Sequence, residues 1–505
     1  MNQRKAGAML SYVYLGITFA IGIIYTPILF GFLGEREYGV YSVASSAIAF
    51  LAILDLGFGQ TMIRYVARYK ALGDKDGEER LHGMFLILYT GIALIALIAG
   101  LVVYFNLEFF FHRGFTPQEV SQLSKIFLIL LINLVISFPL GIFNSIISAN
   151  EGFFFLKMIN IISTLLTHAA ILAALFMGYR TVAMALITTV VSVVLKLVTM
   201  AYGRKKIKIR FRFGSFDSSL FREIFIFSFF IFLNIVIDQL YANTDKMILG
   251  ALCDSAAVAT YTVGVQFYSY FEQFSTSISG VFLPQVTKLL TVHDTMDEVS
   301  ELFIRIGRIQ FFILGFLMSG FVVLGKDFIV LWVGENQIMS YYIALVVIAP
   351  SLIPLSQNIG ISVLRAMNRH KFRSLIYFFI ALVNVALSVP LALMFGGVGA
   401  ACATAFATCT GQIMTMNWFY QKKIGLDIRG YWKQIGPMAV KIVLIALLGW
   451  CVVYFLPGSG WWGLLLQGGI YSVIFLLASW FVILNRYEKS LVTDLLKSAN
   501  GGKSV

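Results

Sequence analysis

Long apolar stretches occupy most of this 505-residue chain and leave only short polar segments between them. Hydrophobic residues make up 59% of the sequence and charged residues 12%, against roughly 25% charged residues in an average soluble protein. A water-soluble fold cannot bury so much apolar surface, and a disordered chain would be rich in charge. Because a helix of about 20 apolar residues crosses a bilayer, we predict an all-α polytopic membrane protein with 14 transmembrane helices. They are placed at 8–32, 39–62, 83–105, 122–148, 155–177, 180–202, 222–250, 257–284, 303–325, 338–364, 373–395, 397–420, 436–456 and 461–485.

Lys and Arg are distributed unevenly between the two sides of this arrangement. Of the 38 basic residues, 31 fall on the side that holds both termini, 5 fall on the other side, and Lys196 and Lys246 lie within predicted spans. Basic residues favour cytoplasmic loops, so both termini are predicted to be cytoplasmic. The net charge of +13 follows from the same rule and does not indicate a nucleic-acid partner. The four Cys residues form no C-x-x-C pair, and we expect neither a metal site nor a cofactor.

A weak internal repeat divides the chain. At a shift of 220 residues Tyr41-Ser42-Val43-Ala44 aligns with Tyr261-Thr262-Val263-Gly264, and at a shift of 218 Ser148-Ala149-Asn150 aligns with Ala366-Met367-Asn368. The repeat predicts two pseudo-symmetric six-helix bundles of the same orientation, an architecture typical of transporters. The predicted parts are an N-terminal lobe (1–202), a basic cytoplasmic linker (203–221), a C-terminal lobe (222–420), helices 13 and 14 (421–485) and a cytoplasmic tail (486–505).

The seventh predicted helix carries an unusual polar stripe. Asn234, Asp238, Tyr241 and Asp245 are spaced 4, 3 and 4 residues apart, which places them on one helix face, and Lys246 follows. Ionisable residues are costly inside a membrane and usually face a cavity. We therefore predict a substrate-binding role for Asp238, Tyr241, Asp245 and Lys246. The alternative is a buried pair or hydrogen bonds between helices.

Three further positions complete the candidate binding site. Glu272 lies near the centre of the eighth predicted helix, where it could bind an ion, contact sugar hydroxyls or form a structural pair. Asn358 and Arg365 share a face of the tenth helix, and an Arg side chain suits phosphate oxygens. Arg64, at the inner end of the second helix, suits either phosphate capture or a snorkelling role at the headgroups. No catalytic residue is predicted.

Several segments resemble the oligosaccharide flippases, the polysaccharide-transporter branch of the multidrug/oligosaccharidyl-lipid/polysaccharide (MOP) superfamily. The resemblance rests on Leu33-Gly34-Glu35-Arg36-Glu37-Tyr38-Gly39-Val40-Tyr41-Ser42, on Asp55-Leu56-Gly57 with Arg64, and on Asp245-Lys246-Met247-Ile248-Leu249-Gly250 followed by Val258-Ala259-Thr260-Tyr261. It implies a central cavity and alternating access. It also implies transport of an undecaprenyl-pyrophosphate-linked oligosaccharide from the cytoplasmic to the outer leaflet of a bacterial inner membrane, for surface polysaccharide biosynthesis.

The resemblance leaves two other transport functions open, namely a lipid II flippase and a cation-coupled multidrug exporter of the same superfamily. Membrane lipids are expected partners, and a polysaccharide polymerase and glycosyltransferases are candidate partners. An enzyme such as an O-antigen polymerase or ligase would need a sizeable outer loop, whereas the largest outer loop here spans only 106–121. The sequence also lacks a G-x-x-x-x-G-K-[ST] phosphate-binding loop, so direct ATP drive is not expected.

Overall fold

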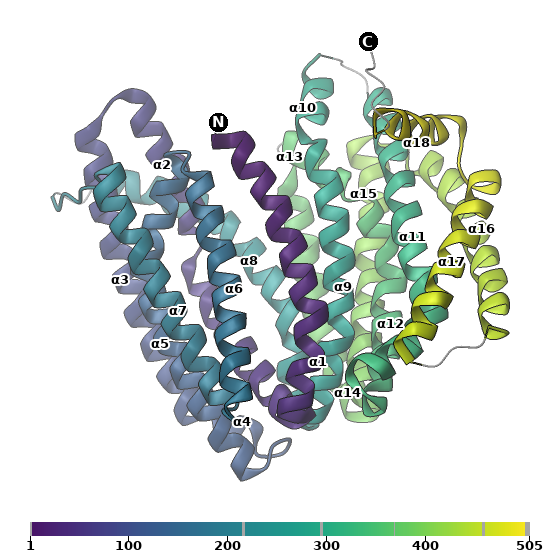
Figure 1. Ribbon diagram of the computed structural model, residues 1–505. Helices are drawn as coiled ribbons and strands as arrows, with labels where there is room; N and C mark the ends of the chain where they lie inside the picture. Colours follow the sequence, from purple (N-terminus) through teal and green to yellow (C-terminus); the bar gives the residue numbers. More distant parts are fainter. Residues whose placement is uncertain (1–2, 215–217, 293–295, 368, 457–459, 500–505) are drawn as a thin grey trace. The chain divides into compact units, whose positions relative to one another are not determined.

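A computed structural model describes residues 3–214, 218–292, 296–367, 369–456 and 460–499, which form helices joined by turns, with no strand among them (Figure 1). The chain divides into two compact units. Unit 1 comprises residues 1–262 and 385–400, and unit 2 comprises residues 263–384 and 401–505. The elements of unit 1 are α1 (Gln3–Leu51), η1 (Ala52–Asp55), α2 (Phe58–Leu72), α3 (Lys75–Phe105), α4 (Leu107–Phe111), α5 (Pro117–Ala149), α6 (Phe153–Phe176), α7 (Thr181–Tyr202), η2 (Gly203–Ile207) and α8 (Ser218–Leu252).

Unit 2 contains the remaining helices, and two helices contribute residues to both units. These two are α9 (Ser255–Val281) and α14 (His370–Ala407). The elements of unit 2 alone are α10 (Leu283–Val292), α11 (Asp297–Val333), η3 (Glu335–Gln337), α12 (Ile338–Ser356), α13 (Ile359–Ala366), η4 (Thr408–Thr415), α15 (Met416–Phe419), η5 (Tyr420–Ile424), α16 (Ile428–Tyr454), α17 (Gly460–Val482) and α18 (Arg486–Ala499).

The described residues contain 11 helical segments long and apolar enough to cross a membrane. Two of these segments are interrupted by a glycine with non-helical backbone, Gly34 (φ 73°, ψ 170°) in α1 and Gly396 (φ 58°, ψ −137°) in α14. The α9 helix is 27 residues long, but its polar residues keep it outside this group. The all-α membrane fold is therefore confirmed, while the number of 14 spans stays a prediction.

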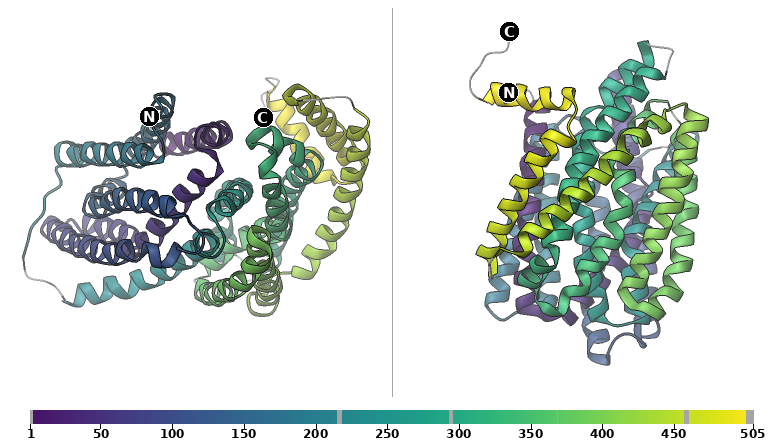
Figure 2. Two further views of the ribbon diagram at one scale, coloured as in Figure 1. Left: turned by 90° about the horizontal axis from the view of Figure 1, so that it is seen from below. Right: turned by 90° about the vertical axis from the view of Figure 1, so that its right-hand side faces the viewer.

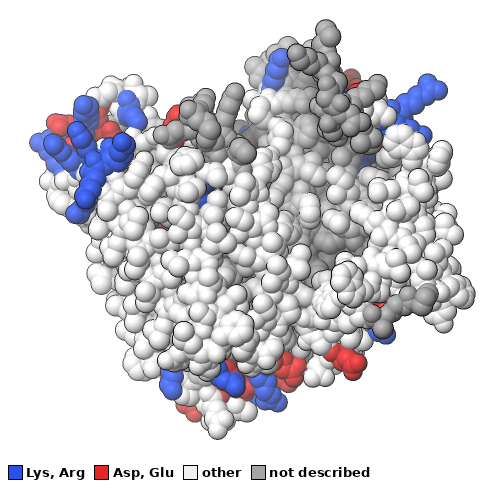
Figure 3. All heavy atoms as spheres, viewed as in Figure 1, with Lys and Arg blue, Asp and Glu red and all other residues white. Residues whose placement is uncertain are grey.

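The surface of the helices is apolar, as expected for a surface that faces lipid. On α3, for example, Leu94, Ile98 and Val102 are 57%, 64% and 59% exposed. On the face shown in Figure 3, charged side chains gather near the ends of the helices and a broad band between them is nearly uncharged. Large exposed apolar surfaces are rare on soluble monomers, so this distribution fits a bilayer.

Each unit has its own packed interior. In unit 1, Phe85 of α3 and Ile142 of α5 belong to a buried cluster that also includes Tyr65 of α2. In unit 2, Phe303 of α11 and Tyr431 of α16 lie in a larger cluster. Lipid chains are as apolar as these side chains, so close van der Waals packing holds the long helices together inside each unit.

The predicted second helix bends sharply at Asp55-Leu56-Gly57. Leu56 and Gly57 have left-handed backbone (φ 53° and 73°), and α2 begins one residue later. The Tyr89 hydroxyl and the backbone N–H groups of Gly57 and Gly59 lie beside the Asp55 carboxylate. The backbone N–H of Leu56 donates to the carbonyl oxygen of Ile53 (3.1 Å). Polar groups of the protein therefore surround the backbone of this corner.

The tenth predicted helix is also broken. The α12 helix contains Pro350 and Pro354 and ends at Ser356, and α13 begins at Ile359. Proline removes a backbone donor and crowds the preceding turn, so Pro350 and Pro354 weaken the last turns of α12. The break after Ser356 makes Asn358 the residue that precedes α13.

The predicted basic linker packs against the start of α3 in unit 1. The backbone N–H of Arg212 donates to the carbonyl oxygen of Glu79 (3.0 Å), the Arg212 side chain pairs with Asp76 (3.0 Å), and Ile209 is buried. Residues 215–217 of this linker lie outside the described residues. The predicted cytoplasmic tail contains a helix that the sequence interpretation did not foresee, α18, which crosses the ends of the neighbouring helices of unit 2 (Figure 2, right).

Helix breaks recur at the shift of the predicted repeat. Gly178 and Gly396, 218 residues apart, both have positive φ, and the break at Gly34 lies 220 residues before the turn between α8 and α9. The α5–α6 turn at Asn150 corresponds in the same way to the α13–α14 turn, although Asn368 itself lies outside the described residues. Matching breaks favour the predicted duplication of the chain.

Candidate functional site

The polar stripe of α8 in unit 1 combines an exposed and a buried carboxylate. Asp238 is exposed, whereas Asp245, two turns later, is 2% exposed. The two carboxylate oxygens of Asp245 accept hydrogen bonds from the Tyr261 hydroxyl (2.5 Å) and the Ser388 hydroxyl (2.7 Å). Tyr241 and Lys246 are partly buried. In this conformation Asp245 joins three segments of unit 1, and Asp238 is the accessible acid of the stripe.

Arg64 lies beside the same helix. Its guanidinium carbon is 4.2 Å from the centre of the Phe227 ring of α8, a cation–π contact. One turn further along α2, Arg68 pairs with Glu223 at 3.3 Å, but both side chains are more than half exposed, so this pair adds little stability. The buried hydroxyls of Thr61 and Ser228 bond at 2.7 Å. Unit 1 therefore brings predicted residue Arg64 against α8.

A second polar cluster joins α9, α11 and α13 in unit 2, and we call it the Ser275 cluster. The buried Ser275 hydroxyl donates to the carbonyl oxygen of Leu355 (2.5 Å) and accepts from the side-chain amide of Asn358 (2.6 Å). The carbonyl oxygen of Ser275 accepts from the side-chain amide of Gln310 (2.9 Å), while Oε1 of Gln310 is buried without a partner in the described part of the chain. The predicted residue Asn358 is thus part of a network.

Two exposed charges flank the Ser275 cluster. Glu272 precedes Ser275 by three residues on α9, and Arg365 follows Asn358 by seven residues on α13, so each lies on the same helix face as its cluster residue. Hydroxyls, amides and a carboxylate can bond sugar hydroxyls, and a guanidinium binds phosphate oxygens in a planar, two-point manner. Unit 2 therefore offers groups for both halves of a phosphorylated sugar.

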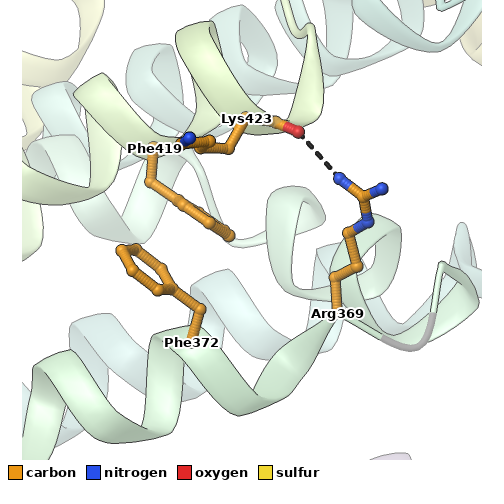
Figure 4. Close-up of a pocket in the computed structure, with 4 residues that line it drawn as sticks. All are labelled: Arg369, Phe372, Phe419 and Lys423. Atoms are coloured by element: carbon orange, nitrogen blue, oxygen red, sulfur yellow. Dashed lines mark hydrogen bonds between the residues drawn. The ribbon is translucent and has the colours of Figure 1, made fainter.

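A small cavity of about 290 Å³ lies beyond α13, between the start of α14 and the end of η5 (Figure 4). Phe372 and Phe419 stack with their ring centres 4.0 Å apart, and Arg369 donates to the carbonyl oxygen of Lys423 (2.9 Å). Arg369 therefore ties two segments of unit 2 together.

The sequence interpretation missed Gln310 and the central position of Ser275. Gln310 is fully buried within the long apolar helix α11, and an amide in such a position needs partners. The need of a buried amide for hydrogen-bond partners was the signal that the sequence offered. Helical spacing, however, does not show which residue of unit 2 is the partner of Gln310. Within the described residues, no group of three His, Cys, Asp or Glu side chains could hold a metal ion.

Taken with the apolar surface, these polar clusters on long helices define the class of the protein: a multi-pass helical membrane protein with charged groups in its spanning segments, as transporters have. A family model described as "Polysaccharide biosynthesis protein" matches residues 5–290, and the chain belongs to this family.

Two sequence relatives and one solved structure extend this finding. The chain is 23% identical over 406 residues to the Shigella flexneri protein named "Putative O-antigen transporter", covering 77% of this chain and 91% of that protein. It is 21% identical over 250 residues to the "Probable low-salt glycan biosynthesis flippase Agl15" of Haloferax volcanii, covering 50% and 52%. The inward closed conformation of the lipid II flippase MurJ is similar in fold, with a TM-score of 0.72, 18% identity and coverage of 94% and 98%. The predicted membership of the MOP superfamily is confirmed.

Proposed function

We propose that this protein is a flippase that moves a polyprenyl-diphosphate-linked oligosaccharide from the cytoplasmic to the outer leaflet of the bacterial inner membrane. The observation that carries the proposal is the Ser275 cluster with its flanking charges, in a chain of the polysaccharide biosynthesis family. Sugar hydroxyls would bond Glu272 and Asn358, the diphosphate would bond Arg365, and the polyprenyl chain would remain in lipid. Arg64 and Asp238 of unit 1 would be further substrate-binding residues.

The transport step would be alternating access without a covalent intermediate. The orphaned Oε1 of Gln310 supports a change of conformation, because a buried acceptor without a donor costs about 1–3 kcal/mol. A second conformation that supplies a donor would recover part of that free energy. Both termini would be cytoplasmic, in keeping with the distribution of Lys and Arg. Glycosyltransferases would act before the flippase, and a polymerase would act after it.

The experiment is a flipping assay in proteoliposomes. The purified chain is reconstituted with a fluorescent lipid-linked oligosaccharide, and a membrane-impermeant lectin reports the fraction that reaches the far leaflet. Arg365→Gln and Glu272→Gln should each lower the initial rate about 10-fold or more, because a charge-assisted hydrogen bond contributes roughly 1.5–3 kcal/mol. Lys326→Gln and Glu301→Gln are the matched controls, since both side chains are exposed in the same unit and lose the same charges.

Two outcomes would contradict the proposal. Flipping of lipid II with no flipping of the oligosaccharide would identify a lipid II flippase. Efflux of cationic dyes from cells, driven by a Na⁺ or proton gradient and unaffected by Arg365→Gln, would identify a multidrug exporter. Equal rates in all four variants would remove the Ser275 cluster from the site.

A further inference from the structure

A larger cavity of about 600 Å³ lies elsewhere in unit 2, between the α15–η5 segment and the first turns of α16. Its volume falls within the range of about 300–1,000 Å³ typical of small-molecule sites. The described residues that line it are Asn417, Gln421, Ile428, Arg429, Trp432 and Lys433. They comprise two cations, two amides, an isoleucine and a tryptophan, with no carboxylate among these described residues.

The cations and the indole come from one face of α16. Trp432 and Lys433 follow Arg429 by three and four residues, and all three side chains are exposed. Neither cation has a carboxylate partner among the described residues. The backbone donors at the start of α16 are already used, because Gln421 accepts from two of them (3.0 and 3.2 Å) and Asp427 caps a third (2.8 Å). The positive charge of the cavity therefore comes from side chains.

The opposite wall contributes an unused acceptor. Oδ1 of Asn417 is buried and has no hydrogen-bond partner among the residues that the structure describes. A buried acceptor of this kind is unfavourable unless a donor reaches it, and the cavity that it lines is the route for one. A ligand that bears both an anionic group and a hydroxyl would satisfy the two cations and Asn417 together.

The same face of α16 continues as an apolar stripe. Val440, Val443, Leu444 and Leu447 are 60%, 57%, 60% and 54% exposed, and they follow Lys433 at helical spacing. A Trp and two basic residues above such a stripe are typical of the boundary between headgroups and acyl chains. A soluble phosphate would use only the cavity, whereas a lipid would use the cavity and the stripe.

We propose that this cavity binds the headgroup of an anionic glycerophospholipid of the surrounding bilayer, with the acyl chains along the exposed face of α16. Arg429 and Lys433 bind the phosphodiester, and Asn417 accepts a hydrogen bond from a hydroxyl of the headgroup. Phosphatidylglycerol has this chemistry, since it carries one negative charge and a glycerol headgroup. Basic pockets between helices on the cytoplasmic side are suited to such lipids. The proposal does not depend on the transported substrate.

Quenching of Trp432 by brominated lipids tests the proposal. The full chain is placed in phosphatidylcholine nanodiscs with increasing fractions of brominated phosphatidylglycerol, and the Trp432 signal is obtained by difference from Trp432→Phe. Half-quenching should need roughly 30-fold less brominated phosphatidylglycerol than brominated phosphatidylcholine, because each basic residue near an anionic lipid contributes about 5-fold. Arg429→Gln with Lys433→Gln should abolish the preference, whereas Arg429→Lys with Lys433→Arg should keep it.

A second comparison of lipids tests the contact with Asn417. Phosphatidylethanol carries the phosphodiester without a headgroup hydroxyl, so the wild-type chain should prefer phosphatidylglycerol over it by roughly 2- to 10-fold, the value of one hydrogen bond. Asn417→Leu should equalise the two lipids. The charge control is Lys422→Gln with Arg204→Gln, two exposed cations outside the cavity. An unchanged melting temperature shows that a variant is folded.

Three results would overturn the proposal. One is equal quenching by brominated phosphatidylglycerol and phosphatidylcholine in the wild-type chain. Another is an equal loss of preference in the charge control, which would indicate only diffuse attraction. The third is displacement of brominated phosphatidylglycerol by glycerol phosphate in solution or by a lipid-linked oligosaccharide, which would assign the cavity to a soluble anion or to the transported substrate.

Discussion

The guanidinium of Arg308 on α11 binds both carboxylate oxygens of Glu488 on α18, with Nε–Oε1 and Nη2–Oε2 distances of 2.7 and 3.0 Å. The two side chains are only 12% and 7% exposed. The same carboxylate accepts the backbone N–H of Asn485, whose side chain accepts the backbone N–H of Glu488 (2.9 and 2.8 Å). The reciprocal hydrogen bonds of Asn485 and Glu488 form a capping box at the start of α18. Glu488 therefore caps α18 and also attaches it to α11 of unit 2.

Replacing Glu488 should therefore destabilise unit 2. Glu488→Gln should lower the free energy of unfolding by about 3–5 kcal/mol, because it leaves a buried guanidinium without its counter-charge. Asp494→Asn, at an exposed position of the same helix, is the control. Thermal unfolding in detergent measures the effect, and adding Arg308→Met to the variant should recover part of it. Equal melting of the variant and the wild-type chain would mean that α18 is not held by this pair.

The environment of Asp245 predicts a structural role that can be separated from substrate binding. Asp245→Ala should destabilise unit 1 by about 1–3 kcal/mol, because the hydroxyls of Tyr261 and Ser388 lose their buried acceptors. Asp238→Ala should leave stability unchanged and lower flipping, because that side chain is exposed. The two variants are compared by thermal unfolding and by the flipping assay. If Asp245→Ala lost flipping at unchanged stability, Asp245 would belong to the binding site as the sequence stripe suggested.

Gly39, within the Leu33–Ser42 segment that carries the family resemblance, has no room for a side chain. A Cβ at this position would lie 1.8 Å from the carbonyl oxygen of Ser255, so Gly39→Ala should force two backbones of unit 1 apart. Overpacking of this kind typically costs about 1–3 kcal/mol. Gly91→Ala is the matched control, because nothing lies within 4 Å of its Cβ position. The expression yield and the melting temperature of the two variants should differ. Equal values would show that the Ser255 backbone moves aside at little energetic cost.

The distribution of basic residues predicts which loops face the cytoplasm. In a variant whose native cysteines are replaced by alanine, Arg113→Cys should react with a membrane-impermeant maleimide in intact cells. Arg80→Cys, between α2 and the apolar part of α3, should react only after permeabilisation. The reverse pattern would place the termini on the outer side.

Much of the fold could be predicted because hydrophobic length is a local property of the sequence. The corner at Asp55-Leu56-Gly57 is also local in the sequence. The helix α18 was not foreseen, although its capping residues Asn485 and Glu488 are close in sequence. Its attachment to Arg308, 180 residues away, could not be predicted from local sequence.

The candidate site could be predicted only in part. Helical spacing identified Asn358 and Arg365 as neighbours on one face; Asn358 belongs to the Ser275 cluster and Arg365 flanks it. Spacing could not show that Asp245 is buried against Tyr261 and Ser388 while Asp238 is exposed. The difference depends on which helix packs against each turn of α8, and that is a tertiary property.

The corner at Asp55 also sets the depth of Arg64 in the bilayer. The helical stretch from Glu35 to Leu51 is only about 25 Å long, shorter than a hydrocarbon core of about 30 Å, so the corner itself must lie within lipid depth. Irregular backbone is tolerated there only when its polar groups are satisfied by protein, and the Asp55 carboxylate lies beside the backbone N–H groups of Gly57 and Gly59. We therefore expect Arg64, two turns beyond the corner, to lie near the plane of the lipid phosphate groups.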